Sequence, residues 1–132
     1  MRYMLNTNIC SYILRSRPQS VKARFDAAGA GTLAISTVVL AELLYGAARH
    51  ATADIIRRET GDLASRLDVL PWDEAAAEHY AGIRAALERR GTPLGAMDMM
   101  IAAHARSLGA TLVSNDVRHF ERVEGLLTAN WA

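Results

Sequence analysis

Four oxygen-bearing side chains follow or interrupt apolar segments of this sequence. They are Asn6, Glu42, Asp98 and Asp116. Glu42 is the most informative of them, because every other residue from 38 to 45 is apolar. A carboxylate on an apolar helix face is costly to bury unless it is paired with a cation or bound to a metal. These four positions are therefore the first candidates for chemistry.

Each position also has a purely structural explanation. Asn6 and Asp116 come where an apolar segment ends, so each could cap the helix that follows, and Asn6 could instead form a turn. Glu42 could pair with Arg49, roughly 10 Å farther along a helix axis. Asp98 lies in a first helical turn, where the helix dipole favours a negative charge. Taken one at a time, the residues leave these alternatives open.

The four positions indicate more together than they do separately. Carboxylates that meet at one place raise one another's pKa, and the arrangement is costly without a cation. Oxygen ligands suit Mg²⁺ or Mn²⁺. Such an ion activates water and neutralises the charge of a phosphodiester under in-line attack. The pattern therefore favours a Mg²⁺ or Mn²⁺ cofactor and hydrolysis of nucleic acid.

The elements that must position these residues alternate between short apolar strands and amphipathic helices. Strands are predicted at 2–5, 32–36, 67–72, 110–114 and 125–129. Helices are predicted from about residue 9, with Asn8 the better cap, and at 18–29, 37–50, 52–67, 73–90, 97–109 and 117–123. This alternation predicts an α/β fold whose central parallel sheet of four to five short strands is flanked by helices. Ligands in such folds bind beyond the carboxyl ends of the strands.

Length and composition narrow the classes of protein further. The 132 residues predict one domain, 1–132, which buries roughly 68% of the unfolded surface. A net charge of +1 and 51% hydrophobic residues exclude a disordered chain and a strongly basic nucleic-acid binder. The single cysteine, Cys10, permits no internal disulfide and no thiolate zinc site, which favours the cytoplasm. No uncharged run approaches the ~20 residues that span a bilayer, so we expect no membrane partner.

At the four candidate positions the chain resembles a PIN-domain ribonuclease toxin of the VapC type. "LNTN" (5–8) is similar to the family's L-D-T-N, and "STVVLAELLYGA" (36–47) to its S-x-x-x-x-E-L-x-x-G helix. "MDMMIAAHA" (97–105) is similar to D-x-x-I-A-A. "TLVSNDVRHFERVEGL" (111–126) is similar to L-V-T-x-[DN]-x-x-[DE]-F-x-x-[VI]-x-G-L. The resemblance spans essentially all 132 residues, in the expected order.

The resemblance implies a PIN-like fold with a metal site at the same four positions. Asn6 and Asp98 would be direct metal positions, Glu42 a ligand directly or through water, and Asp116 a nearby support. Ser36, Thr7 and Ser114 would hydrogen-bond around them. The resemblance further implies the toxin of a type II toxin–antitoxin pair that cuts structured RNA, including transfer RNA. A VapB-like antitoxin would silence it, and a homodimer and a larger assembly with the antitoxin are expected.

The chain departs from the family at the first position of the first motif. Asn6 stands where the family has Asp, so one negative charge leaves the metal site while the shape is nearly kept. Changes around metal ligands commonly cost 10–100-fold in affinity or activity, so losing a ligand charge should cost on the order of 100-fold or more. We therefore expect an impaired nuclease. The alternative is a degenerate, non-catalytic PIN domain that binds protein or RNA.

Basic and apolar clusters leave further alternatives open. Two groups of cations could contact RNA phosphates or be ordinary exposed helix charges. They are Arg15, Arg17, Lys22 and Arg24, and Arg84, Arg89 and Arg90. The apolar stripe within residues 38–45 could serve a dimer or an antitoxin helix, or could simply pack in the core. The four histidines show no paired metal-ligand spacing.

Overall fold

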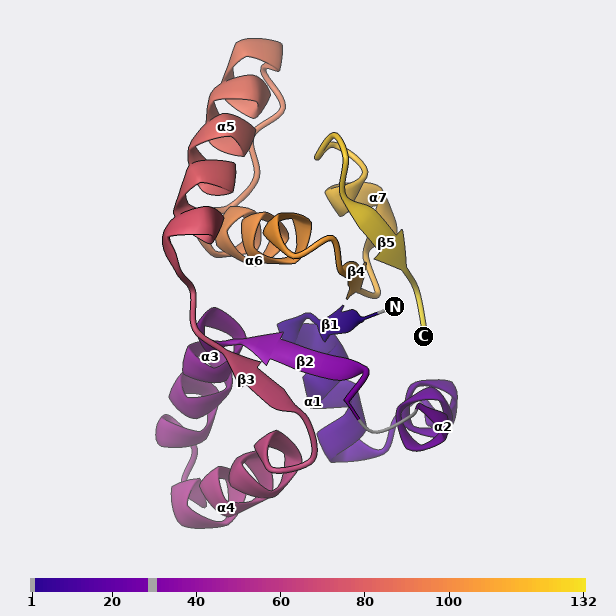
Figure 1. Ribbon diagram of the computed structural model, residues 1–132. Helices are drawn as coiled ribbons and strands as arrows, with labels where there is room; N and C mark the ends of the chain where they lie inside the picture. Colours follow the sequence, from indigo (N-terminus) through magenta and orange to yellow (C-terminus); the bar gives the residue numbers. More distant parts are fainter. Residues whose placement is uncertain (1, 29–30) are drawn as a thin grey trace.

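A five-stranded, fully parallel sheet forms the centre of the computed structural model, which describes residues 2–28 and 31–132 (Figure 1). The strands are β1 (Tyr3–Leu5), β2 (Leu33–Ser36), β3 (Asp68–Leu70), β4 (Thr111–Val113) and β5 (Leu127–Ala129). They lie in the order β3-β2-β1-β4-β5. The prediction of an α/β fold with four to five short parallel strands is confirmed.

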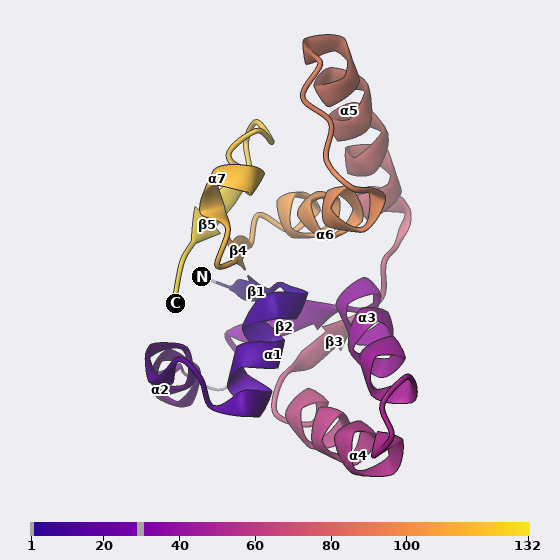
Figure 2. The same cartoon turned by 180° about the vertical axis from the view of Figure 1, so that it is seen from behind.

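The helices occupy the connections between the strands. They are α1 (Thr7–Arg15), α2 (Gln19–Ala27), α3 (Thr37–Ala48), α4 (Ala53–Ala64), α5 (Glu74–Arg90), α6 (Ala96–Ser107) and α7 (Val117–Phe120). The strand order steps one way from β1 to β3 and the opposite way from β4 to β5. Right-handed crossovers therefore place α1–α4 and α5–α6 on opposite faces, as Figures 1 and 2 show. The predicted end of the second helix at Gly29 lies outside the described residues.

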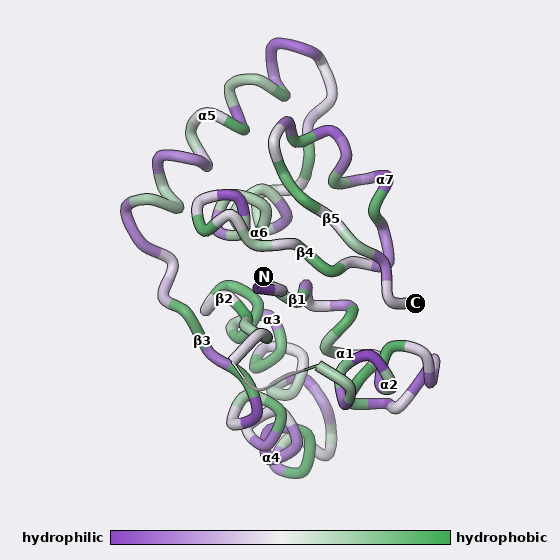
Figure 3. The backbone as a smooth tube through the Cα atoms, turned by 45° about the vertical axis from the view of Figure 1, so that its right-hand side comes forward, coloured by the Kyte–Doolittle hydropathy of each residue, from purple (hydrophilic) through white to green (hydrophobic). Residues whose placement is uncertain are grey.

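The core follows directly from the apolar strands. All four residues of β2 and all three of β4 are buried, and so are Met4 and Leu5 in β1. A strand covered on both faces reads as a continuous apolar run, which is why the alternation of a half-exposed strand is missing here. Along α5, hydrophilic and hydrophobic residues instead follow one another at about the helical period, as in a helix with one exposed face (Figure 3).

This topology contains a switch in chain direction between two neighbouring strands, β1 and β4. β1 and β4 are neighbours, with Leu5 opposite Val113, but the chain leaves them in opposite directions across the sheet. Open α/β sheets bind ligands at such a switch in direction, beyond the carboxyl ends of the two strands. Asn6 and Ser114 are the first residues beyond those two ends. No helix in the described part of the chain is long and apolar enough to cross a membrane.

His104 on α6 is a buried histidine. Only 2% of this residue is exposed, and its Nδ1 has no hydrogen-bond partner within residues 2–28 and 31–132. Burial lowers the pKa of His104 below its ordinary value of 6.5, and the nearby negative charge of Asp73 partly offsets this effect. The folded chain therefore favours the neutral imidazole.

We expect stability to fall in mild acid because of His104. Below its ordinary pKa the unfolded chain binds more protons than the folded one, so the free energy of unfolding falls as the pH drops from about 6.5 towards the lower folded-state pKa. One such group contributes at most about 1.4 kcal/mol per pH unit. Urea titrations at about pH 7.5 and about pH 5.5 should show a smaller acid loss for His104→Gln than for the parent chain. Equal losses would contradict this role.

Candidate active site

Asn6 lies at the carboxyl end of β1 and caps α1. Its backbone is extended, and its Oδ1 accepts the N–H of Asn8 at 2.8 Å. Its Nδ2 donates to Ser114 Oγ at 3.3 Å, and only 6% of the residue is exposed. The prediction that Asn8 caps a helix beginning near residue 9 is wrong. Because β1 ends at Leu5, Asn6 is the first residue free to turn, and α1 begins at Thr7.

Glu42 on α3 lies at the same carboxyl end of the sheet, where it meets the first residue of α1. Ser36 ends β2 and caps α3 by accepting the N–H of Val38 at 3.1 Å, which fixes the direction of the helix. Glu42, half-buried in the second turn, accepts a hydrogen bond from Thr7 Oγ1 at 2.6 Å. No ion pair joins Glu42 to Arg49 among the described residues. Glu42 is therefore hydrogen-bonded to a hydroxyl of α1 and is not paired with Arg49, the partner considered from the sequence.

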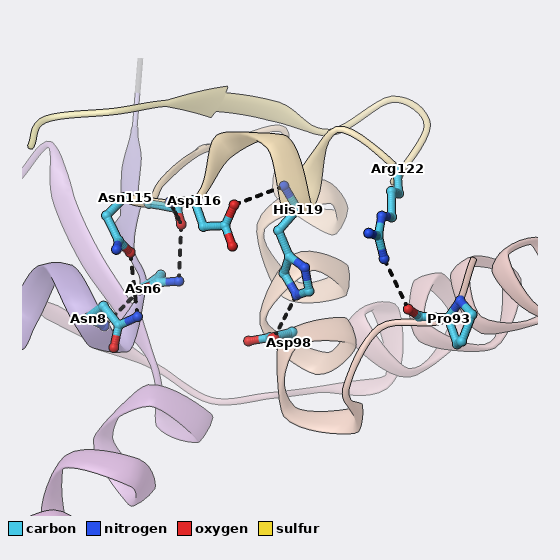
Figure 4. A network of polar contacts seen from close by, with 9 residues as sticks. Asn6, Asn8, Pro93, Asp98, Asn115, Asp116, His119 and Arg122 are labelled. Atoms are coloured by element: carbon cyan, nitrogen blue, oxygen red, sulfur yellow. Dashed lines mark hydrogen bonds and ion pairs between the residues drawn. The ribbon is translucent and has the colours of Figure 1, made fainter.

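Asp98 lies in the first turn of α6 and contacts a residue that the sequence did not single out. Its Oδ2 lies 3.0 Å from Nε2 of His119, and the two side chains are 40% and 28% exposed. His119 belongs to α7, so this contact joins α6, the helix that precedes β4, to α7, the helix that follows it (Figure 4). The sequence signal that could have found His119 was its position three residues after Asp116, on the helix that this aspartate caps.

Asp116 is exposed and serves as the cap of α7. Its Oδ1 accepts the N–H of His119 at 3.2 Å, and its own N–H donates to Ser114 Oγ at 2.9 Å. The buried hydroxyl of Ser114 therefore joins the chain after β4 to Asn6 after β1. Asn115, also not singled out from sequence, donates to Tyr12 at 3.1 Å and accepts from Asn8 at 3.4 Å. These contacts hold the segment after β4 against α1 (Figure 4).

Comparison with known proteins shows the family to which this chain belongs. The PIN-domain family matches residues 3–126. The tRNA(fMet)-specific endonuclease VapC of Shigella flexneri is 45% identical over 132 residues, covering 100% of this chain and 99% of that protein. The chain is a PIN-domain protein of the VapC family. Ribonuclease VapC2 of Haemophilus influenzae is 41% identical over 131 residues, covering 99% of this chain and 98% of that one.

Solved structures of VapBC complexes match the PIN-domain fold along its whole length. VapBC2 from Rickettsia felis, bound to a DNA fragment from its promoter, superposes with a TM-score of 0.94 at 35% identity and covers 100% of both chains. DNA-bound VapBC from Salmonella typhimurium gives a TM-score of 0.94 at 38% identity, covering 100% of this chain and 99% of that one.

The candidate ligands of this PIN domain are oxygen atoms, the donor type that a hard divalent cation prefers. Asn6, Glu42, Asp98 and Asp116 all offer oxygen, which suits Mg²⁺ or Mn²⁺. Each of the three carboxylates uses one oxygen in a protein contact and has a second one, and an amide oxygen has two lone pairs. In the ranges that the structure describes, however, no three His, Cys, Asp or Glu side chains converge closely enough to form a metal site. Asn6 adds no negative charge to this set.

A groove of about 630 Å³ extends from the candidate site between α1, α3 and α4. Thr7 and Glu42 line one part of it, and apolar side chains that include Leu14 and Ile56 line another. Tyr45 also lines the groove and is 67% exposed, which is unusual for a large aromatic side chain. This PIN domain therefore offers an open, partly apolar channel that leads to Glu42.

Proposed function

We propose that this chain is the toxin of a type II toxin–antitoxin pair and a Mg²⁺- or Mn²⁺-dependent endoribonuclease that Asn6 impairs. The observation that carries the proposal is the contact of Asn6 with Ser114, which places the family's first acidic position beside the segment that holds Asp116. The ribonuclease and tRNA endonuclease names of the VapC relatives support the activity.

Asn6, Glu42, Asp98 and Asp116 would hold the cation. When bound, the ion activates water and stabilises the charge that develops on the phosphodiester. The chain's own residues orient the ligands, and such supporting contacts affect metal affinity and activity. Thr7 directs Glu42, Ser114 directs Asn6, and His119 holds one oxygen of Asp98 and leaves the other for a ligand.

The test is cleavage of total cellular RNA by the Asn6→Asp variant with Mg²⁺ or Mn²⁺, with and without a chelator. We expect cleavage by the variant that the chelator abolishes, and much weaker cleavage by the parent chain. A variant that neither cuts RNA nor binds either metal would overturn the nuclease proposal for this chain.

A second candidate function is a non-catalytic PIN domain that binds protein or RNA. One observation favours it: both polar ends of the Asn6 amide are already hydrogen-bonded within the chain, so the neutral site is complete without a cation. The same reversion separates the two functions, because a binding module has no cleavage to recover.

The substrate we propose is structured RNA, including transfer RNA. The support is the name of the Shigella flexneri relative, a tRNA(fMet)-specific endonuclease 45% identical to this chain. Comparing the fragments produced from purified tRNA and ribosomal RNA by the Asn6→Asp variant tests this choice. Equal, unselective cutting of both would argue against it.

We propose that a VapB-like antitoxin binds the groove between α1, α3 and α4, as the VapBC neighbours suggest. Tyr45→Glu, which places a charge in the groove, should weaken capture of the cognate antitoxin by about tenfold or more, since aromatic side chains dominate interfaces. Ile55→Glu is the matched control, because Ile55 is 58% exposed but does not line the groove. Equal effects of the two changes would place the antitoxin elsewhere.

The homodimer, the larger assembly with the antitoxin and the cytoplasmic location stay predictions. Light scattering of the isolated chain at micromolar concentration tests the homodimer, and a monomer there would refute it. Light scattering of the chain copurified with its antitoxin tests the assembly, and cell fractionation tests the location.

A further inference from the structure

A second hollow, of about 150 Å³, lies between α5, α6 and the segment that follows α7. Three arginines from these three parts of the chain line it: Arg90, Arg106 and Arg122. Glu124 is the single carboxylate among the described residues that line it. Three positive charges therefore face one negative charge around a small concave surface.

Neutral acceptors hold these guanidinium groups in place. Arg106 donates through Nε to His79 Nδ1 at 2.8 Å and through Nη1 to the carbonyl of Glu124 at 2.9 Å. Arg90 donates to the carbonyl of Arg122, and Arg122 donates to the carbonyl of Pro93 at 3.2 Å. These hydrogen bonds orient the three side chains, and none of the acceptors is a carboxylate that would neutralise the arginine charge.

Other basic side chains of the chain form ion pairs with carboxylates. Arg84 pairs with Glu88 along α5, and Lys22 pairs with Asp26 along α2. These members of the predicted basic clusters are therefore ordinary helix-surface ion pairs. Within residues 2–28 and 31–132, no ion pair involves Arg90, Arg106 or Arg122. Their charge is left for a ligand.

Gly82 keeps the hollow open from the side of α5. Glycine inside a helix costs about 1 kcal/mol relative to alanine, so its presence in α5 calls for a reason. A Cβ at Gly82 would lie 3.9 Å from Nη2 of Arg106, which is an ordinary contact distance. Packing therefore does not demand glycine here. A side chain at this position would instead cover part of the Arg106 guanidinium.

The hollow is connected to the candidate active site through α7. Arg122 follows His119 by three residues, and its contact with Pro93 lies beside the contact of Asp98 with His119 (Figure 4). Pro93 belongs to the loop that leads into α6, which carries Asp98. A nucleic acid that reaches the site can therefore continue towards the arginines.

We propose that this hollow binds a backbone phosphate of the RNA outside the site of cleavage. The guanidinium fork matches the geometry of phosphate oxygens, and charge-assisted contacts of this kind are strong. Arginine has five N–H donors, and Arg90 and Arg122 each use one in a hydrogen bond within the described chain. The hollow would fix the position of the RNA strand, whereas Asn6, Glu42, Asp98 and Asp116 would act at the bond that is cut. The inference rests on RNA being the substrate.

The experiment measures binding of a labelled tRNA to the full chain in EDTA, where no metal-dependent cleavage interferes. Arg90→Gln/Arg122→Gln should raise Kd about tenfold and reduce the slope of log K against log salt by about 1 to 2. Arg57→Gln/Arg58→Gln on α4 is the matched control, because it removes the same charge from exposed arginines that line neither hollow. It should leave both quantities near those of the parent chain.

A second variant leaves the arginines in place. Gly82→Glu introduces a good helix former whose carboxylate faces Arg106, so the fold should be kept while RNA binding falls by a similar factor. Parent-like Kd and salt slope in both variants would overturn the proposal. A second result would also overturn it: the parent chain binds inorganic phosphate tightly, as detected from the Nε–H signals of the three arginines, but both variants keep the parent affinity for tRNA. Failure of the nuclease proposal would appear separately, as absent cleavage by Asn6→Asp with tRNA binding intact.

Discussion

Replacing Asn6 with aspartate is expected to raise the rate of RNA cleavage in Mg²⁺ or Mn²⁺ by about 100-fold or more. The site can accept this charge. The carboxylate keeps the cap, because it still accepts the N–H of Asn8, and the amino end of α1 favours a negative charge. The hydroxyl of Ser114, which now accepts from the amide, can rotate to donate instead.

Metal binding by the Asn6→Asp variant should also appear in its thermal stability. A ligand that binds only the folded chain stabilises it by about 2.7 kcal/mol at a hundredfold excess over Kd. We expect Mn²⁺ to raise the Tm of the variant and to change that of the parent chain much less. Asn130→Asp is the control, since it adds the same charge at an exposed residue near the carboxyl terminus. A control that gains activity or metal-dependent stability would rule out a specific role for Asn6.

Glu42→Gln or Asp98→Asn in the Asn6→Asp background should reduce cleavage by about 100-fold or more, because each removes one negative charge from the proposed cation site. Both changes preserve shape and hydrogen bonds. A glutamine oxygen still accepts from Thr7, and an asparagine oxygen still accepts from His119. Partly exposed charges of this kind contribute little to stability, so we expect Tm to change by less than about 3 °C.

The control for these changes is Glu59→Gln, which neutralises another carboxylate lining the same groove. It should leave cleavage unchanged. If Glu42→Gln or Asp98→Asn instead lowers Tm strongly while cleavage of the remaining folded protein is normal, the carboxylate has a structural role and not a catalytic one. Metal binding measured on the folded variants gives an independent reading, since loss of a ligand should weaken Mn²⁺ binding without unfolding the chain.

Much of the secondary structure could be predicted from short stretches of sequence. Residues 73–90 carry an acidic start, a basic end and a following glycine, and α5 spans Glu74–Arg90 with Gly91 in the left-handed conformation. Helix ends and buried strands have local signatures because they depend on backbone groups and side chains only a few residues apart. The error at Asn8 arose because three consecutive residues, Asn6, Thr7 and Asn8, are all of types that cap helices, and local sequence did not show where β1 ends.

The contacts of the candidate site were beyond such local reasoning. Sequence alone pointed to Asn6, Glu42, Asp98 and Asp116 as chemically unusual, and to the parallel sheet that carries them. Only the tertiary structure decided that Asn6 meets Ser114, 108 positions away, that Thr7 holds Glu42, and that His119 contacts Asp98. The physical reason is that residue type and spacing are local properties. Side-chain pairing instead depends on which strands lie side by side, and here β1 lies beside β4 although most of the chain separates them.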